Sequence, residues 1–297
     1  MPLRAVTGHL LVRQLGHWLP DALHRSRRAT LVQAYGGDPG DTPEAALRAC
    51  TQAADRLRGR QLTVVVVAGN AVDVAGRLDA PAPGAGVAVH GVPGGPDHVP
   101  VALKAAAAAG APVLTYLDAS TGPAPGPATL AAVAGGRPGE LLLVLGPAAR
   151  AGFDHRAAPA SVGFPLVTAV ELVEPATDGR WLVVFATRLG RALDAFKEAL
   201  WAADGVRLRD PDDPDAEAVD VTSRPDLGPL RRALVAHLGS VRRASVADLR
   251  RFTATATIHR SADTDRVLAE LLAEGAVDRE PRAGRLAGDV VIRPSAS

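Results

Sequence analysis

Residues 62–70 read LTVVVVAGN and contain four consecutive valines, so a strand here carries apolar side chains on both faces. Such strands are typical of a sheet that helices cover on both sides. Comparable runs are ATLVQAY at 29–35, GVAVHGV at 86–92, PVLTYLDAS at 112–120, ELLLVLG at 140–146 and RWLVVFATRLG at 180–190. Segments of helix length separate these runs, and parallel neighbours need crossovers of that length. The pattern predicts an α/β fold with a Rossmann-like, mostly parallel sheet.

The residues before the first strand predict an amphipathic helix. Leu11, Leu15, Leu19 and Leu23 recur at helical spacing with polar residues between them, so we expect a helix over residues 6–27. With the alternating strands that follow, this helix assigns residues 1–205 to one Rossmann-like domain.

The chain changes character after that domain. Residues 206–225 are acidic and rich in proline, which predicts a solvated linker or an insertion. Three short amphipathic helices follow in DLGPLRRALVAHLG, ASVADLRRFTATA and SADTDRVLAELLAEG, and two short strands surround Gly284. Three helices with such a hairpin predict a winged helix-turn-helix domain over residues 226–297.

Composition excludes several classes of protein. The chain is 47% hydrophobic and 22% charged with a net charge of +1, as expected of a packed globular protein. Its start lacks the features of a secretory signal, and no apolar run reaches the length of a membrane helix, so we expect a cytoplasmic protein without a membrane segment. Cys50 is the single cysteine, which excludes a disulfide or a thiolate zinc cluster within one chain. The histidines show no metal-binding spacing, so we expect no metal.

A glycine-rich turn follows the first predicted strand and forms the first candidate site. Gly36, Gly37 and Gly40 let a backbone approach a ligand closely, and the helix expected from Thr42 offers free N–H groups. Asp38 would repel a phosphate, which favours a neutral or zwitterionic ligand. An ordinary structural turn explains the glycines equally simply.

Asp118 is the second candidate, because it ends a strand expected at the centre of the sheet. Ligands of open α/β sheets bind at the carboxyl ends of strands near the point where the strand order reverses. The alternative is that Asp118 braces the loop after its own strand. Tyr35 and Tyr116 are candidates for lining the same cleft.

Three segments resemble the three-Cys-motif partner (TcmP) family. The most specific is WLVVFATRLGRALDAFKEALWAADG at 181–205, in which Lys197 and Trp201 hold the places of a lysine and a tryptophan of that family. YLDASTG at 116–122 resembles the family's fourth-strand element, and AYGGDPGDTPEAAL at 34–47 resembles its first glycine loop. The resemblance implies a class I methyltransferase-type Rossmann domain joined to a winged helix, and a partner protein that carries a three-cysteine motif.

The resemblance also implies S-adenosylmethionine as a cofactor, but two departures argue against binding. Methyltransferases have an acidic residue after the second strand to hold the ribose, whereas this chain has Gly69 and Asn70, and Asp73 is the nearest acid. The fourth-strand element keeps Asp118 but lacks the proline and phenylalanine that follow it in the family. Candidate cofactor-binding residues are therefore Tyr35, Gly36, Gly37, Asp38, Gly40, Asn70 and Asp118. No catalytic residue is identified.

The leading hypothesis is a degenerate methyltransferase-like partner or accessory protein. One alternative is an active S-adenosylmethionine-dependent methyltransferase, and another is a DNA-binding regulator that senses a ligand. In the expected recognition helix Arg266 stands among four acids, which would repel phosphates. Nucleic acid would instead meet Arg279, Arg282 and Arg285 of the wing. Protein docking is therefore the favoured role of the winged helix.

Overall fold

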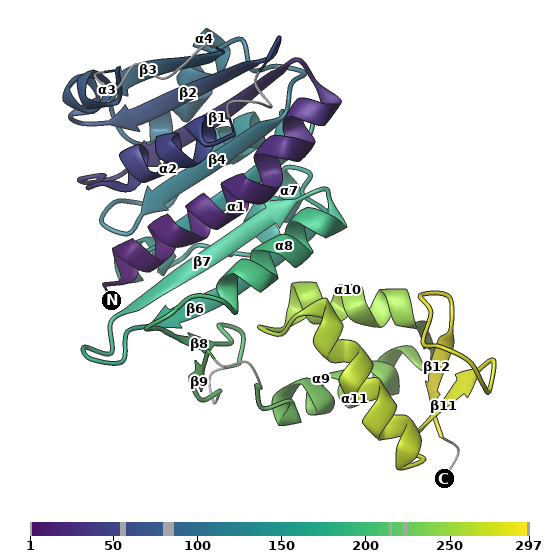
Figure 1. Ribbon diagram of the computed structural model, residues 1–297. Coiled ribbons are helices and arrows are strands. Elements are labelled where there is room, and N and C mark those ends of the chain that lie inside the picture. Colours follow the sequence, from purple (N-terminus) through teal and green to yellow (C-terminus); the bar gives the residue numbers. More distant parts are fainter. Residues whose placement is uncertain (1, 54–57, 80–85, 214–215, 222–224, 296–297) are drawn as a thin grey trace.

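The computed structural model describes residues 2–53, 58–79, 86–213, 216–221 and 225–295. Within these ranges, nine strands form one sheet in the order β3-β2-β1-β4-β5-β7-β6-β8-β9 (Figure 1). The strands are β1 (Arg28–Tyr35), β2 (Gln61–Ala68), β3 (Val87–Pro93), β4 (Val113–Ala119), β5 (Gly139–Leu145), β6 (Leu166–Val173), β7 (Arg180–Thr187), β8 (Arg207–Arg209) and β9 (Val219–Asp220). The first five strands pair in parallel, and β7 runs antiparallel to both β5 and β6. This confirms the predicted α/β fold with a mostly parallel central sheet.

Helices cover both faces of the sheet. One layer holds α1 (Leu3–Arg25), α2 (Thr42–Thr51), α3 (Ala71–Asp79) and α8 (Gly190–Leu200). The opposite layer holds α4 (Val99–Ala105), α5 (Pro127–Ala134), α6 (Pro147–Arg150) and α7 (Ala157–Ser161), together with the short 3₁₀ turn η2 (Pro96–His98). Figure 1 shows α1 crossing the near face of the sheet beside α2 and α8. The strand order reverses between β1 and β4, which is where ligands of such sheets bind.

Strand β6 has no counterpart among the apolar runs of the sequence. It contains Glu171, which is 1% exposed and forms ion pairs with Arg150 and with Arg209, the latter at 3.0 Å. A buried carboxylate is tolerated where charged partners surround it, and here both partners come from distant segments. The segment 206–225 also differs from a plain linker, because β8 and β9 lie within it and extend the sheet. Residues 214–215 and 222–224 of that segment lie outside the described ranges.

The C-terminal module consists of α9 (Gly228–Val241), β10 (Ala244–Ser245), α10 (Val246–Ala256), α11 (Ser261–Ala273), β11 (Val277–Glu280) and β12 (Val291–Pro294). Its three strands pair in the antiparallel order β10-β12-β11, and the helices enclose a separate apolar core. Ser245 caps α10 by accepting a hydrogen bond from the Asp248 N–H. The three predicted helices are present, while identification of the module as a winged helix stays a prediction.

Candidate functional site at the carboxyl edge of the sheet

The glycine loop after β1 packs against the loop after β4. The Gly36 N–H donates to the Asp118 carbonyl at 2.8 Å, which continues the pairing of the two strands by one step. A Cβ on Gly36 would lie 3.3 Å from the Gly122 Cα, and one on Gly37 would lie 2.4 Å from the Thr121 Oγ1. The space that these glycines leave open is therefore occupied by residues of the same chain.

A third glycine packs against the loop after β4 from the side of β5. Gly146 follows β5, and a Cβ there would lie 2.0 Å from the Ser120 carbonyl oxygen, closer than atoms approach. Ser120, Thr121 and Gly122, which we name the 120–122 turn, are thus held between the ends of β1 and β5. This turn lies at the point of the sheet where the strand order reverses.

The Asp118 carboxylate braces that turn. Its side chain is 5% exposed, and Oδ1 accepts a hydrogen bond of 2.8 Å from the Ser120 N–H. Of the two roles that the sequence left open for Asp118, the structure provides the contact for the bracing role.

Tyr35 and Tyr116 are core residues that face α1. Both are buried, with ring centroids 5.8 Å apart. The Tyr35 hydroxyl donates to the Gln33 Oε1 at 2.8 Å, and the Tyr116 hydroxyl donates to the Thr7 Oγ1 at 3.2 Å. Burial, with the neighbouring tyrosine and carboxylates, raises the Tyr35 pKa well above its usual value. The two rings therefore stay neutral and fill the space beneath α1.

Asp38 and Gly40 complete the glycine loop. The Asp38 Oδ1 accepts from the Gly40 N–H at 3.1 Å, and Gly40 has a positive φ of 58°. The Asp38 carbonyl accepts from the Arg4 guanidinium, which ties the loop to the start of α1. Asp38 thus organises its own loop, and the glycine is needed for the left-handed backbone.

The end of β2 provides no carboxylate. Gly69 and Asn70 are exposed, and the Asn70 carbonyl accepts the Val74 N–H in the first turn of α3. Asp73 is exposed in the same turn. An adenosyl cofactor needs an acid here for its ribose and open space over the glycine loop. The described residues at the end of β2 supply no such acid, so the ribose contact that the resemblance implies is missing here.

Lys197 and Trp201, which the sequence analysis named only through the family resemblance, join the sheet domain to the C-terminal module. Lys197 is buried on α8 and donates to the Thr257 carbonyl, while the Trp201 Nε1 donates to the Ile258 carbonyl at 2.8 Å. Burial lowers the Lys197 pKa to about 7. The His259 ring stacks on Trp201 at 5.8 Å. These contacts join α8 to the connection between α10 and α11, and they anchor the C-terminal module to the sheet domain.

The arginines of the C-terminal module are largely engaged within it. Arg250 pairs with Asp265 at 2.8 Å, and Arg231 pairs with Glu274. Arg279 donates from Nε to the Pro281 carbonyl at 2.9 Å and from Nη1 to the Gly284 carbonyl at 2.8 Å. Arg279 therefore braces the hairpin loop, whereas Arg282 and Arg285 are exposed.

Among the described residues, no three His, Cys, Asp or Glu side chains lie together in a way that could hold a metal ion. The same part of the chain contains no helix with the length and apolar character needed to cross a bilayer.

No protein-family model and no curated protein matches the sequence. Among solved structures, an rRNA methylase from Streptococcus thermophilus is similar in fold, with 13% sequence identity and a TM-score of 0.33. The match covers 58% of this chain and 93% of that chain. At that TM-score the likeness carries no argument about the function of this chain.

Proposed function

We propose that this chain is a degenerate methyltransferase-like protein that acts as a partner or accessory protein. The order of its first seven strands, 3-2-1-4-5-7-6 with β7 reversed, agrees with the class I methyltransferase-type sheet that the sequence resemblance implies. The observation that carries the proposal is the 120–122 turn, which fills the space over Gly36 and Gly37. The missing carboxylate after β2 supports it independently.

The C-terminal module, which we take to be a winged helix, is the proposed docking element. Its anchoring through Lys197 and Trp201 holds it against the sheet domain, so a bound partner would meet both parts of the chain. Asp265 of α11 and Glu274, which directly follows that helix, pair with the module's own arginines. Protein docking therefore suits this module better than contact with a phosphate backbone. Following the resemblance, the proposed partner carries a three-cysteine motif.

Calorimetric titration with S-adenosylmethionine and S-adenosylhomocysteine tests the loss of cofactor binding. We expect no saturable heat and no thermal stabilisation by either ligand. Binding with a Kd of about 10 μM or tighter would contradict the proposal. Saturable methyl transfer to any cellular fraction would do the same.

The matched variant Asn70→Asp distinguishes the two proposed reasons for the loss of cofactor binding, which are the missing carboxylate after β2 and the 120–122 turn. It restores a carboxylate at the exposed end of β2 without touching the 120–122 turn. Because the turn still fills the glycine loop, we expect the variant to remain without binding. Gain of cofactor binding in this variant alone would show that the turn does not close the site.

A further inference from the structure

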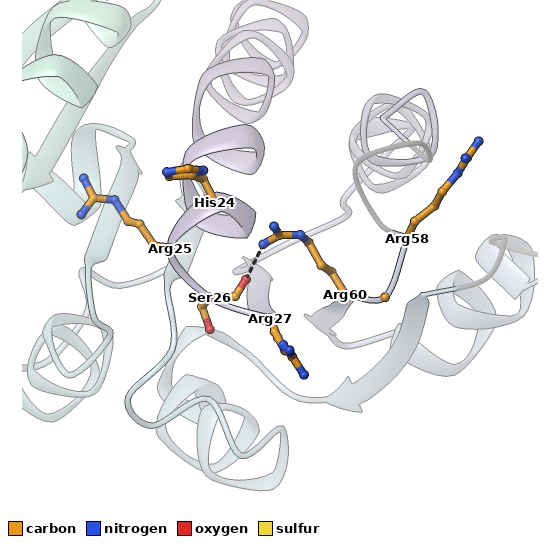
Figure 2. A pocket seen from close by; sticks show the side chains of 7 residues that line it. His24, Arg25, Ser26, Arg27, Arg58 and Arg60 are labelled. Carbon is orange, nitrogen blue, oxygen red and sulfur yellow. Dashed lines mark hydrogen bonds between the residues drawn. The ribbon is translucent and has the colours of Figure 1, made fainter.

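The opposite, amino edge of the sheet contains a cleft lined by arginines. The cleft has a volume of about 550 Å³ and is lined by Gly59 and by six residues that we name the arginine pocket: His24, Arg25, Ser26, Arg27, Arg58 and Arg60. Figure 2 shows Arg60 directed toward Ser26, while Arg25, Arg27 and Arg58 extend outward from the backbone. The five basic side chains come from two segments about thirty residues apart in sequence.

The register of the sheet brings the two segments together. β1 and β2 pair in parallel from their first residues, with Arg28 opposite Gln61. The Gln61 N–H donates to the Arg27 carbonyl at 2.8 Å, and the Arg60 guanidinium donates to the Ser26 carbonyl at 3.3 Å. The pocket therefore lies at the end of α1 and in the connections that lead directly into β1 and β2.

The positive charge of the pocket is not balanced by acids of its lining. None of the seven lining residues is acidic. Within the described ranges, no carboxylate forms an ion pair with Arg25, Arg27 or Arg60. This distinguishes the pocket from the C-terminal module, whose Arg231 and Arg250 are paired. Exposed guanidinium groups without an ion-paired carboxylate, such as those of Arg25 and Arg27, favour an anionic ligand.

Further arginines continue the charge along the same edge. Arg28 begins β1, Arg137 precedes β5 and Arg188 follows the reversed strand β7, and all three are exposed. From β2 to β7 the strand order makes four steps, which span roughly 19 Å at about 4.8 Å a step. That length corresponds to between about five and six base-pair steps of a duplex at 3.4 Å each. An extended polyanion fits such a row better than a single small anion does.

We propose that the arginine pocket and the adjoining amino edge bind the phosphodiester backbone of a nucleic acid. Arginine pairs with phosphate, as with carboxylate, through two parallel hydrogen bonds, and the length of the arginine row is what favours a phosphodiester chain over an isolated anion. No Phe, Tyr or Trp side chain lines the cleft, so His24 is the one aromatic ring of the lining on which a base can stack. The contact is therefore with the backbone and independent of sequence. This site goes beyond the proposed accessory function and does not depend on cofactor binding at the other edge.

Fluorescence anisotropy with labelled duplex RNA and duplex DNA of about 20 base pairs tests the site in the full-length protein. The variant Arg25→Glu/Arg27→Glu changes two exposed side chains of the pocket. Its matched control, Arg282→Glu/Arg285→Glu, makes the same charge change at two exposed positions of the C-terminal hairpin. We expect the pocket variant to lose more than about tenfold in affinity and to show a shallower dependence on salt. The control should stay within about twofold of wild type at the same salt concentration.

Three outcomes would overturn the proposal. They are absence of binding by wild type at low salt, equal losses in both double variants, and complete displacement of the duplex by polyglutamate at an equal concentration of charges. The last result would indicate a general site for acidic chains. Thermal melting of each variant verifies folding. If the double variant is unfolded, Arg60→Gln replaces it, because this change removes one charge at the half-buried side of the pocket. Unchanged affinity and salt dependence in Arg60→Gln would equally overturn the proposal.

Discussion

The two edges of the sheet use their residues in opposite ways. At the carboxyl edge, Gly36, Gly37 and Gly146 pack against the 120–122 turn, and the Asp118 Oδ1 accepts a hydrogen bond from the Ser120 N–H of that turn. At the amino edge, Arg25, Arg27 and Arg60 line a cleft, and none of these three forms an ion pair with a carboxylate of the described residues. The comparison teaches that glycines at a strand end can allow close packing of the protein's own backbone. Exposed arginines at the other end favour an anionic partner from outside the chain.

The largest expected effect tests whether the carboxyl edge is as closely packed as its glycines indicate. Gly146→Ala places a Cβ against the Ser120 carbonyl, which is backbone and cannot rotate away. We expect a loss of roughly 3 kcal/mol in the free energy of unfolding, measured by denaturant titration. Gly59→Ala at the amino edge meets no atom within 4 Å and should cost only about 1 kcal/mol, because Gly59 has a positive φ of 69°. Equal losses in the free energy of unfolding for Gly146→Ala and Gly59→Ala would contradict the inference that the carboxyl edge is the more closely packed of the two.

A buried carboxyl near the amino edge gives the next effect. Glu140 on β5 is 2% exposed, and its Oε2 accepts from the Gln14 Nε2 at 3.3 Å. Burial raises the Glu140 pKa from 4.5 to about 7. Because the folded state resists ionisation, stability is lost as the pH rises from about 4.5 to about 7, and the penalty is complete above that range.

Glu140→Gln removes this penalty and keeps an oxygen that can accept from Gln14. We expect the substitution to stabilise the protein by roughly 2 kcal/mol more at pH 8 than at pH 5, measured by denaturant titration at the two pH values. A stabilisation that does not change with pH would show that Glu140 titrates normally. The proposed phosphate contact of the arginine pocket is tested at one pH and stays unaffected by that result.

The smallest effect concerns one hydrogen bond. Asp118→Ala removes the acceptor of the Ser120 N–H and should lower the free energy of unfolding by about 1 kcal/mol. Asp118→Asn keeps an acceptor and should remain near wild type. At the other edge, Arg27→Ala should change stability by less than about 0.5 kcal/mol, since Arg27 is exposed. A large loss in Arg27→Ala, seen in thermal melts, would mean that the arginine pocket is part of the folded core.

Apolar patterning predicted most of the fold, because six of the sheet strands coincide with runs rich in Val, Leu and Ala, five of them mostly buried. It missed β6, since Glu171 interrupts the run and its partners Arg150 and Arg209 are remote in sequence. It also missed β8 and β9, because their surroundings are acidic. Edge strands this short carry little pattern of their own.

The candidate sites were less accessible to sequence analysis. The glycine loop left two interpretations open because its occupant, the 120–122 turn, lies more than eighty residues away. The arginine pocket went unnoticed for a similar reason, since Arg27 and Arg60 meet only through the register of β1 and β2. Lys197 did leave a local signal: it occupies a buried position of α8 between Phe196 and Leu200, where a charged residue needs a specific partner.

That partner is a carbonyl oxygen, as is the partner of Trp201. Every amino acid carries the same carbonyl group, so these two hydrogen bonds do not depend on which side chains stand at positions 257 and 258. Side chains also fix the connection between α10 and α11, because the Thr257 Oγ1 donates to the Thr253 carbonyl at 2.8 Å and Ile258 is buried. The outer surface of the module, and with it the choice of partner, can therefore change during evolution while its attachment to the sheet domain is kept.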